Sequence, residues 1–233
     1  GGNVARNRGA SLASGDILMF LDDDDTWEPP KIRKQVAILE SQPDVGLVYS
    51  GKLVVSDTNR NSILYQILPK YTGNVYPKIL YENFIGTTSS VAVRKTIFEE
   101  AGRFDEELLA LQDYDLWIRC CSKTLVQHDN QCNIRYTISD QTGTQVTSQT
   151  YRHIQAVEHI LEKYKDEINS QGILEARQIR ASLFYLVAKS KRKSSIHEAI
   201  PWMLKSLIYF PNLRAIIILL PNYITQWIRH LKN

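Results

Sequence analysis

Four consecutive aspartates, Asp22, Asp23, Asp24 and Asp25, follow a run of five apolar residues at positions 17–21. Five apolar residues are too few for a helix but fit one buried strand of a parallel sheet. Ligands of such sheets bind outside the carboxyl ends of the strands, which is where these acids would lie. Four like charges repel one another, and a Mg²⁺ or Mn²⁺ ion would relieve that repulsion with the oxygen ligands it prefers. Because Mg²⁺ is usually held by one or two carboxylates together with substrate phosphates, the run predicts a site for a metal–diphosphate.

The residues after the acids strengthen this interpretation against a merely solvated acidic loop. Pro29 and Pro30 precede a predicted helix at residues 31–40, and proline favours the start of a helix. The apolar face expected for this helix consists of Ile32, Val36 and Leu39. A calcium-binding EF-hand is excluded, because Trp27 would stand at the loop position that requires glycine.

The composition predicts one globular domain with an appendage. The chain has 233 residues, of which 43% are hydrophobic, so it can bury a real core. The net charge is only +3, yet eight Lys and Arg residues and one acid follow position 188. The three cysteines, Cys120, Cys121 and Cys132, lack the spacing of a zinc site and fit a reducing compartment. Because the chain opens on Gly1 without an initiating methionine, we expect a fragment or a processed piece.

The pattern of apolar residues and turn signals predicts an alternation of helices and strands, followed by helices alone. The first part is expected to contain helices at 3–14, 31–40, 95–101 and 113–121 and strands at 17–21, 45–50 and 86–94. Residues 51–76 are expected to be irregular, with a hairpin tip at 57–59, and residues 137–150 to be a flexible polar segment. Helices are predicted at 151–168, 172–192, 196–209 and 212–231. We therefore place a domain boundary near residue 148, which gives domains at 1–148 and 149–233.

A second acidic pair, Asp113 and Asp115, stands at the start of the predicted helix at 113–121. The positive end of the helix macrodipole favours an acid at this position, and that effect alone would account for either aspartate. A structural role and a chemical role therefore remain open for these residues on the pattern alone.

Several ordered motifs together resemble the family 2 glycosyltransferases of the GT-A fold, from residue 3 to about residue 136. The motifs are Ala-Arg-Asn-Arg-Gly at 5–9, Ser-Gly-Asp at 14–16 leading into residues 20–27, Thr-Ser-Ser-Val at 88–91, and Gly-Arg-Phe-Asp-Glu at 102–106 leading into Gln-Asp-Tyr-Asp-Leu-Trp at 112–117. Each motif is weak by itself, and the resemblance rests on their order and spacing.

The resemblance implies an α/β fold of the GT-A type, with the mixed, Rossmann-like sheet of nucleotide-diphospho-sugar transferases and an α-helical C-terminal tail. It implies that Asp22, Asp23 and Asp24 form the DXD element of the family. Asp22 and Asp24 would then hold Mg²⁺ or Mn²⁺, and Asp22, Asp23 and Asn7 would bind the donor.

By the same resemblance Asp113 is the general base. It would take the proton from an acceptor hydroxyl, on a glycan or a lipid-linked acceptor, as that hydroxyl attacks the anomeric carbon of a nucleotide-sugar donor. A single displacement of this kind inverts the configuration. The family usually has Glu before this acid, and Gln112 stands here. With less like-charge repulsion, the pKa of Asp113 is expected to be lower than it would be beside Glu.

Two departures from the family predict that the chain is truncated and inactive by itself. The nucleobase-binding βαβ region of the family would precede Asn3, and two βα units of about 30 residues each suggest that roughly 60 residues are absent. The family's histidine after the base is also missing, since Tyr136 and the residues up to Asp140 stand there. Asp140 is only a weak substitute as a third metal ligand.

A haloacid dehalogenase-like phosphatase is an alternative, because Asp22 to Thr26 also matches the pattern D-x-D-x-T. In that case Asp22 would accept a phosphoryl group and Asp24 would act as the acid and base. This class also needs a later Ser or Thr, a Lys and an acidic pair after separate strands, and Asp113 and Asp115 at a helix start fit that requirement poorly.

A second alternative is a non-catalytic piece that contacts a membrane surface through its basic helical tail. Lysines and an arginine at 189–193, the apolar run at 215–220 and several aromatic residues suggest interfacial contact. The run of six residues is too short for a transmembrane helix, which needs about 20. A helical subdomain with solvated lysines explains the same features. No nucleic-acid-binding module is recognisable. By family analogy and from the basic tail, we expect a bacterial cytoplasmic protein, peripheral to the inner face of the plasma membrane, that builds a surface polysaccharide or glycolipid.

Overall fold

The computed structural model describes residues 1–138, 150–192 and 195–218, which fall into two compact units. The first, here called the sheet unit, comprises Gly1–Ile79, Asn83–Glu107 and Gln112–Asp140. The second, here called the helical unit, comprises Leu80–Glu82, Leu108–Leu111 and Gln141–Asn233. The expected domain boundary near residue 148 lies outside the described residues.

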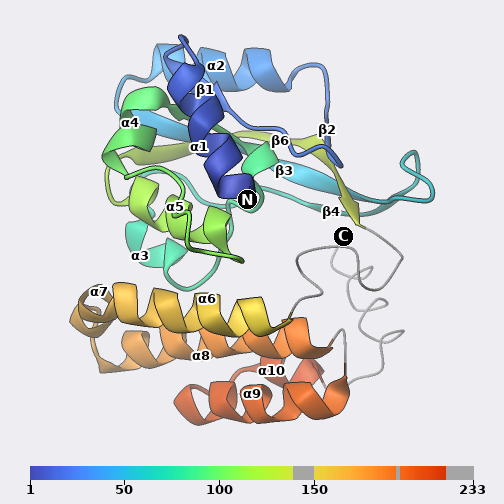
Figure 1. Cartoon of the computed structure of the whole chain (residues 1–233), viewed down its shortest axis with the longest axis vertical. Coiled ribbons are helices and arrows are strands. Elements are labelled where there is room, and N and C mark those ends of the chain that lie inside the picture. Colours follow the sequence, from blue (N-terminus) through green and yellow to red (C-terminus); the bar gives the residue numbers. More distant parts are fainter. Residues whose placement is uncertain (139–149, 193–194, 219–233) are drawn as a thin grey trace. The chain divides into compact units, whose positions relative to one another are not determined.

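The sheet unit is built on one mixed sheet (Figure 1), as the sequence predicts. Its strands are β1 (Ile17–Met19), β2 (Thr26–Trp27), β3 (Val45–Ser56), β4 (Ile63–Ile67), β5 (Val91–Arg94) and β6 (Leu125–Ile138). The order is β1-β5-β3-β6-β2, with β4 added beside β3. Only β3 and β6 pair in parallel among the described strands, and the other pairs are antiparallel.

The apolar run before the aspartates forms a strand, but its expected surroundings are wrong. β1 covers three residues and pairs antiparallel with β5, at the end of the described strand order. Only its middle residue, Leu18, is fully buried. The run is thus half-buried and has an antiparallel neighbour, where the sequence predicts a strand buried between parallel ones. The acids still follow the carboxyl end of β1.

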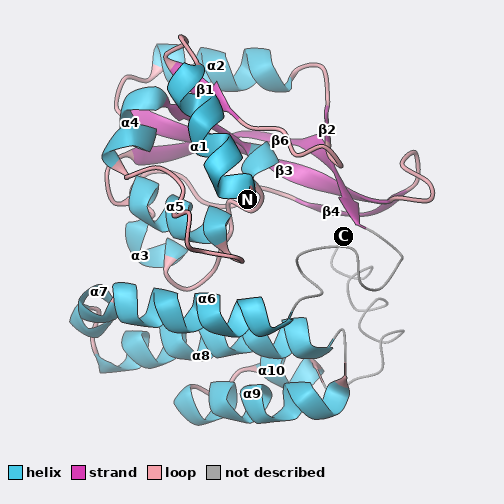
Figure 2. Ribbon diagram, viewed as in Figure 1, coloured by secondary structure: helices cyan, strands magenta, loops and turns pink. Residues whose placement is uncertain are grey.

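Helices lie on both sides of this sheet (Figure 2). They are α1 (Gly2–Leu12), α2 (Lys31–Ser41), α3 (Tyr76–Ile79), α4 (Lys95–Glu100) and α5 (Gln112–Cys121), with a 3-10 turn, η1, at Thr88–Ser90. On α2, Leu39 is buried as expected, but Lys31 and Gln35 share its buried face and Ile32 is half exposed. A buried polar network, described below, explains why a lysine and a glutamine occupy that face.

The segment expected to be irregular contains half of the longest strand pair. β3 continues through residues 51–56, where it pairs with both β4 and β6, and the chain turns back between Ser56 and Ile63, as the predicted tip indicates. Gly51 permits this close packing, because a Cβ atom there would lie 2.4 Å from the carbonyl oxygen of Ile67 and 2.9 Å from Sγ of Cys132. β6 itself was not expected from the sequence.

The helical unit contains α6 (Thr150–Lys163), α7 (Lys165–Ser170), α8 (Ile173–Arg192), α9 (Ile196–Tyr209) and α10 (Leu213–Ile217). The helices predicted at 172–192 and 196–209 are confirmed, whereas the one at 151–168 is divided at Tyr164. Most of the helix predicted at 212–231 lies outside the described residues. Packing between α8, α9 and α10 buries a small cluster that includes Ala188, Met203 and Ala215. Among the described residues, none of the helices is both long and apolar enough to cross a membrane.

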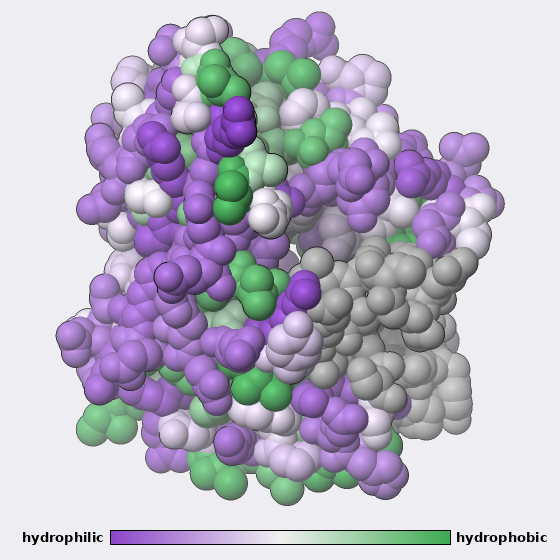
Figure 3. All heavy atoms as spheres, viewed as in Figure 1, coloured by the Kyte–Doolittle hydropathy of each residue, from purple (hydrophilic) through white to green (hydrophobic). Residues whose placement is uncertain are grey.

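Apolar side chains are also present at the surface of the helical unit. Apolar groups lie among polar ones on the face drawn in Figure 3, including along its lower edge. The large apolar side chains that are more than 45% exposed on α9 and α10 are Leu204, Ile208, Leu213 and Ile216.

Candidate active site

Asp22, the first acid of the run, is oriented by α1 and η1. Nη2 of Arg6 on α1 donates to one carboxylate oxygen of Asp22 at 2.5 Å. The hydroxyl of Thr88 donates to the other oxygen at 2.9 Å, and the backbone N–H of Asp22 donates to Oγ of Ser89 at 3.1 Å. Two contacts therefore orient the carboxylate, and a third fixes the backbone of Asp22 where β1 ends.

The other acids of the run differ in burial and in pKa. Asp23 is exposed, whereas Asp24 is half-buried. Burial raises the pKa of Asp24, and repulsion by Asp22 and Asp23 adds to that increase. Asp25 is buried, and burial raises its pKa to about 6. One carboxylate oxygen of Asp25 accepts the backbone N–H of Thr137 at 3.2 Å, and hydrogen bonding to Ser89 and Thr137 partly opposes the rise in its pKa. Within the described residues, its Oδ2 atom is buried without a hydrogen-bond partner.

These oxygens form a donor set that fits a divalent cation with a hard, oxygen-seeking character. Burial of the Oδ2 atom of Asp25 without a partner is unfavourable in free energy, and so is the repulsion of Asp24 by Asp22 and Asp23. A nearby cation would reduce both effects. Within the described residues, no three His, Cys, Asp or Glu side chains are grouped closely enough to hold a metal by themselves. A Mg²⁺ ion that shares its coordination with substrate phosphates does not need such a group. Asp140, the expected weak third ligand, lies outside the described residues.

Asp113, the expected base, lies in the first turn of α5, within electrostatic reach of the acid run. The backbone N–H of Tyr114 donates to its carboxylate at 2.7 Å. Its pKa is raised to about 6, mainly because the carboxyl group is desolvated, and the charge of Asp22 adds to the increase. Lys52 and Arg6 act in the opposite direction. That the pKa of Asp113 is lower beside Gln112 than it would be beside Glu stays a prediction. The pKa of Asp113 is nevertheless above its usual value, because the effect of desolvation exceeds that of the nearby cations. The charge of Asp22 thus acts on Asp113, although 91 residues separate the two in the chain.

Asn7, expected to bind the donor, is placed in a buried contact between α1 and the loop before α5. Its Nδ2 group donates to the carbonyl oxygen of Phe104 and to Oε1 of Glu106, both at 2.9 Å. Its Oδ1 accepts the backbone N–H of Phe104 at 3.0 Å. These bonds use both hydrogens and the oxygen of the amide, so they give Asn7 a structural role. A contact with the donor stays a prediction.

Asp115, which follows the base by two residues, also has a structural role. Its carboxylate is buried and accepts hydrogen bonds from Nε and Nη2 of Arg119 at 3.0 and 2.6 Å. The same guanidinium donates to the carbonyl oxygen of Arg103 at 2.7 Å. Asp115 therefore joins α5 to the loop after α4, whereas the charge of Asp22 acts on Asp113.

Lys52 is a site residue that the sequence interpretation missed. Its ammonium lies 4.7 Å from the ring centre of Tyr136, and its strongest charged neighbours are Asp113 and Asp25. The residue was overlooked because residues 51–76 were expected to be irregular. A usable signal was present, since a lysine followed by Leu-Val-Val lies in an otherwise apolar stretch.

A buried network of hydrogen bonds holds η1 against α2 and β3. Nζ of Lys31 donates to Oε1 of Gln35 at 2.7 Å, and Nε2 of Gln35 donates at 2.9 Å to the hydroxyl of Ser50 and to the carbonyl oxygen of Ser90. The hydroxyl of Ser50 donates in turn to Asp129. The network links α2, β3 and β6 to the turn that carries Thr88 and Ser89, and so to Asp22.

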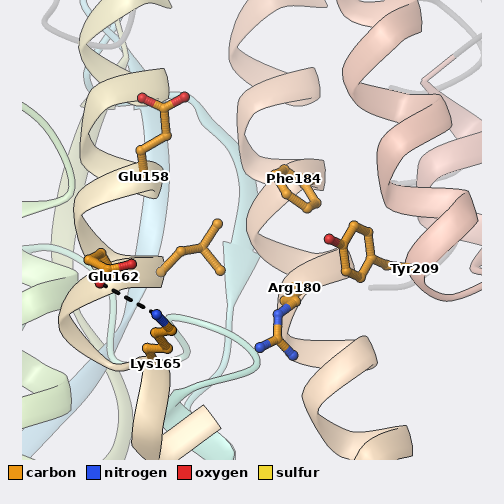
Figure 4. A pocket seen from close by; sticks show the side chains of 7 residues that line it. Glu158, Glu162, Lys165, Arg180, Phe184 and Tyr209 are labelled. Carbon is orange, nitrogen blue, oxygen red and sulfur yellow. Dashed lines mark ion pairs between the residues drawn. The ribbon is translucent and has the colours of Figure 1, made fainter. Parts of the chain in front are cut away.

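The helical unit has a shallow pocket of about 280 Å³ that contains none of the predicted site residues (Figure 4). It is lined by Glu158, Leu161, Glu162, Lys165, Arg180, Phe184 and Tyr209. Lys165 and Glu162 form a loose ion pair at 3.8 Å. The pocket is open and mixes both signs of charge, so it does not rival the acidic site as a catalytic centre.

Comparisons with known proteins give the family. The sequence model of a family described as "Glycosyltransferase like family 2" matches residues 1–190. A glycosyltransferase of Haemophilus influenzae is 25% identical over 81% of this chain and 62% of its own length. One of Methanocaldococcus jannaschii is 32% identical over 52% of this chain and 41% of its own length. The amylovoran biosynthesis glycosyltransferase AmsB of Erwinia amylovora is 32% identical over 51% of this chain and 40% of its own length.

The chain spans about half of the length of these relatives. Nothing in these matches favours the phosphatase alternative. Both the aspartates at 22–25 and Asp113 lie within the matched segment, residues 1–190. The chain therefore belongs to the glycosyltransferase-like family 2.

Proposed function

We propose that the chain transfers a sugar, with inversion, from a nucleotide-diphosphate donor to a hydroxyl group of an acceptor. The expected inactivity of the chain by itself stays a prediction, which nucleotide release by the purified chain would refute. The observation that carries this proposal is the electrostatic coupling between the acid run and Asp113. The charge of Asp22 acts on the pKa of Asp113, although the two residues belong to different motifs and different elements. This coupling supports a single displacement, in which the proposed ligands of the leaving diphosphate and the proposed base act in one site.

Asp22 and Asp24 are the proposed ligands of a Mg²⁺ or Mn²⁺ ion on the donor, and Asp23 is proposed to contact the donor beside them. When bound, the ion would neutralise negative charge that builds on the diphosphate as it leaves. The protein's own part is orientation, because Arg6 and Thr88 hold the Asp22 carboxylate in place before any ligand arrives. Side chains that are already oriented in this way lose little conformational entropy when the metal and donor bind.

Asp113 is the proposed general base. The acceptor oxygen forms a bond to the anomeric carbon, the bond between that carbon and the diphosphate oxygen breaks, and the acceptor proton moves to the carboxylate of Asp113. A pKa of about 6 keeps most of this carboxylate ionised at pH 7, while making it a stronger base than an ordinary aspartate. Base assistance of this type contributes about 10²–10⁴-fold to a rate.

The biological setting is proposed from similarity and charge. One relative is named for the biosynthesis of a polysaccharide, amylovoran, and we propose a surface polysaccharide or a glycolipid as the product here. A peripheral position at the cytoplasmic face of a membrane is supported by the excess of basic residues after position 188 and by the exposed apolar side chains on α9 and α10.

The test is release of nucleotide from a panel of UDP-, GDP- and dTDP-sugars by the purified chain, with and without Mn²⁺. We expect release from at least one donor that depends on Mn²⁺ and falls at least about 100-fold in Asp113→Asn. The matched control is Asp105→Asn, because Asp105 belongs to the same motif region but is not proposed as a base. NMR of the sugar product then reports inversion. Release that is equal in Asp113→Asn and wild type would refute the proposed base.

A further inference from the structure

The ammonium group of Lys52 has an unusual position for a charged group in a strand. Lys52 belongs to β3, whose neighbours in the register are Ile67 on β4 and Ile134 on β6. Its side chain is only partly exposed, and burial lowers its pKa. Within the described part of the chain, no acceptor lies within hydrogen-bond distance of its ammonium group. The ammonium nitrogen lies 4.7 Å from the centre of the Tyr136 ring.

The loop at Gly86 packs against the ammonium group of Lys52 and against the helix that carries the base. A Cβ atom at Gly86 would lie 3.3 Å from Nζ of Lys52, so a larger residue would crowd the cation. The carbonyl oxygen of the same glycine accepts a hydrogen bond from Nε1 of Trp117 at 2.9 Å. Trp117 lies one turn after Asp113 on α5. Lys52, Gly86 and the helix that carries the base are thereby packed together.

The charged and titratable groups that face Asp113 come from four elements. Arg6 on α1 and Lys52 on β3 are cations, and Asp22 after β1 is an acid. Tyr136 on β6 is also coupled to Asp113, and burial raises the pKa of its phenol group. Of the two cations, Arg6 is engaged in an ion pair with Asp22 at 2.5 Å. Lys52 is therefore the cation with an uncommitted charge, and Asp113 is its first electrostatic partner.

We propose that Lys52 is the positioning residue for the base, holding the carboxylate of Asp113 ionised and directed into the site. This inference rests on the proposed function, in which Asp113 is the base. During transfer the negative charge moves from the carboxylate to the leaving diphosphate. The charge of Lys52 acts on both Asp113 and Asp25 of the acid run. Its cation would therefore stabilise the negative charge on the base before transfer and the charge near the acid run after it. The ring of Tyr136 keeps the ammonium in place without neutralising it.

The test is a direct titration of Asp113 by ¹³C NMR in protein labelled at the aspartate carboxyl carbons. The signal is assigned by its loss in Asp113→Asn. In Lys52→Met we expect the midpoint of Asp113 to rise by about one pH unit, because an opposite charge within a few ångströms shifts a carboxyl group by about 1–3 units. In Lys52→Arg, which keeps the charge, the midpoint is expected to stay within about half a unit of wild type.

Lys70→Met is the matched control, because it removes one lysine charge from an exposed position of the same unit. Its Asp113 midpoint is expected to equal that of wild type. Lys52→Gln serves as a second neutral variant if Lys52→Met fails to fold. An unchanged or lowered midpoint in the neutral variants would overturn the proposal, and so would the same rise in Lys70→Met. The titration needs no donor, so its outcome is distinct from failure of the nucleotide-release test.

Discussion

The hydroxyl of Thr88 donates to the carboxylate of Asp22 at 2.9 Å, across 66 residues of sequence. Thr88 lies on η1, which is fixed from behind by the hydrogen bond from Gln35 to the carbonyl oxygen of Ser90. The turn also receives Nε1 of Trp27 at the carbonyl oxygen of Ser89. The position of the first acid is therefore set by a turn that belongs to a different motif, and the two motifs work as one unit.

Removal of this contact tests whether Asp22 must be pre-oriented. Thr88→Val keeps the shape of the side chain but removes the donor, and hydrogen bonds to a charged group are worth about 1.5–3 kcal/mol. We expect Mn²⁺-dependent binding of UDP to weaken by about tenfold, as measured by isothermal titration calorimetry. Thr88→Ser, which retains a hydroxyl, is the control and should bind nearly as wild type does. Equal affinity in Thr88→Val would show that the contact does not position the acid.

The activity should depend on the protonation of Asp113. Its pKa is raised to about 6. The ionised carboxylate that acts as the base is therefore lost as the pH falls through that value, and it is the main form at about pH 7 and above. We expect the rate of nucleotide release to fall about tenfold for each pH unit below 6. A rate that stays constant between pH 5 and 7 would show that a base with this pKa does not limit the reaction.

Asn7 should contribute to stability more than to binding. Its three hydrogen bonds join α1 to the loop at Phe104 and Glu106, and a buried group left unsatisfied costs about 1–3 kcal/mol. We expect Asn7→Ala to lower the free energy of unfolding in urea by about 2 kcal/mol. Ser11→Ala, at an exposed position of α1, is the control and should have little effect. If Asn7→Ala instead kept its stability and lost affinity for UDP, the predicted contact with the donor would be supported.

Lys31 should make the free energy of unfolding depend on pH. It is fully buried, and burial lowers its pKa to about 7, which the charge of Asp129 only partly opposes. Between pH 7 and about 10.4, the usual lysine value, the unfolded chain holds a proton that the native state has released. The free energy of unfolding therefore rises with pH across that window.

Comparison with Lys31→Met isolates this term from the other groups that titrate in the same range. Relative to Lys31→Met, wild type should gain on the order of a few kcal/mol from pH 7 to pH 10. The measurement is urea unfolding at several pH values. Lys34→Met, on the same helix, should show no such trend relative to wild type. A constant difference between wild type and Lys31→Met across this range would contradict the lowered pKa.

Much of the site could be predicted from the sequence because its chemistry is local. The aspartates after β1 and Asp113 at the start of α5 follow short patterns of apolar residues, and each lies where those patterns place it. The orientation of Asp22 by Thr88 and Arg6 could not be predicted, since it depends on tertiary contacts between separate segments.

The errors have physical causes of the same kind. On α2, the helical periodicity favours Ile32 as a core residue, yet the buried face carries Lys31 and Gln35 because their polar groups find partners across the sheet. In β3, Gly51 and Lys52 interrupt the apolar pattern, so the sequence predicts that the strand ends there. The glycine is required by the close approach of Ile67, and the lysine reaches into the site. In each case a tertiary contact overrides the local pattern.

The central claim is that the aspartates after β1 hold a metal–diphosphate. The most direct test is isothermal titration of UDP into the chain with Mn²⁺ and with EDTA, for wild type, Asp24→Asn and Asp113→Asn. We expect binding that requires Mn²⁺, is lost in Asp24→Asn, and is retained in Asp113→Asn, because the proposed base does not contact the diphosphate. Absence of binding in wild type, or equal binding with EDTA or in Asp24→Asn, would contradict it.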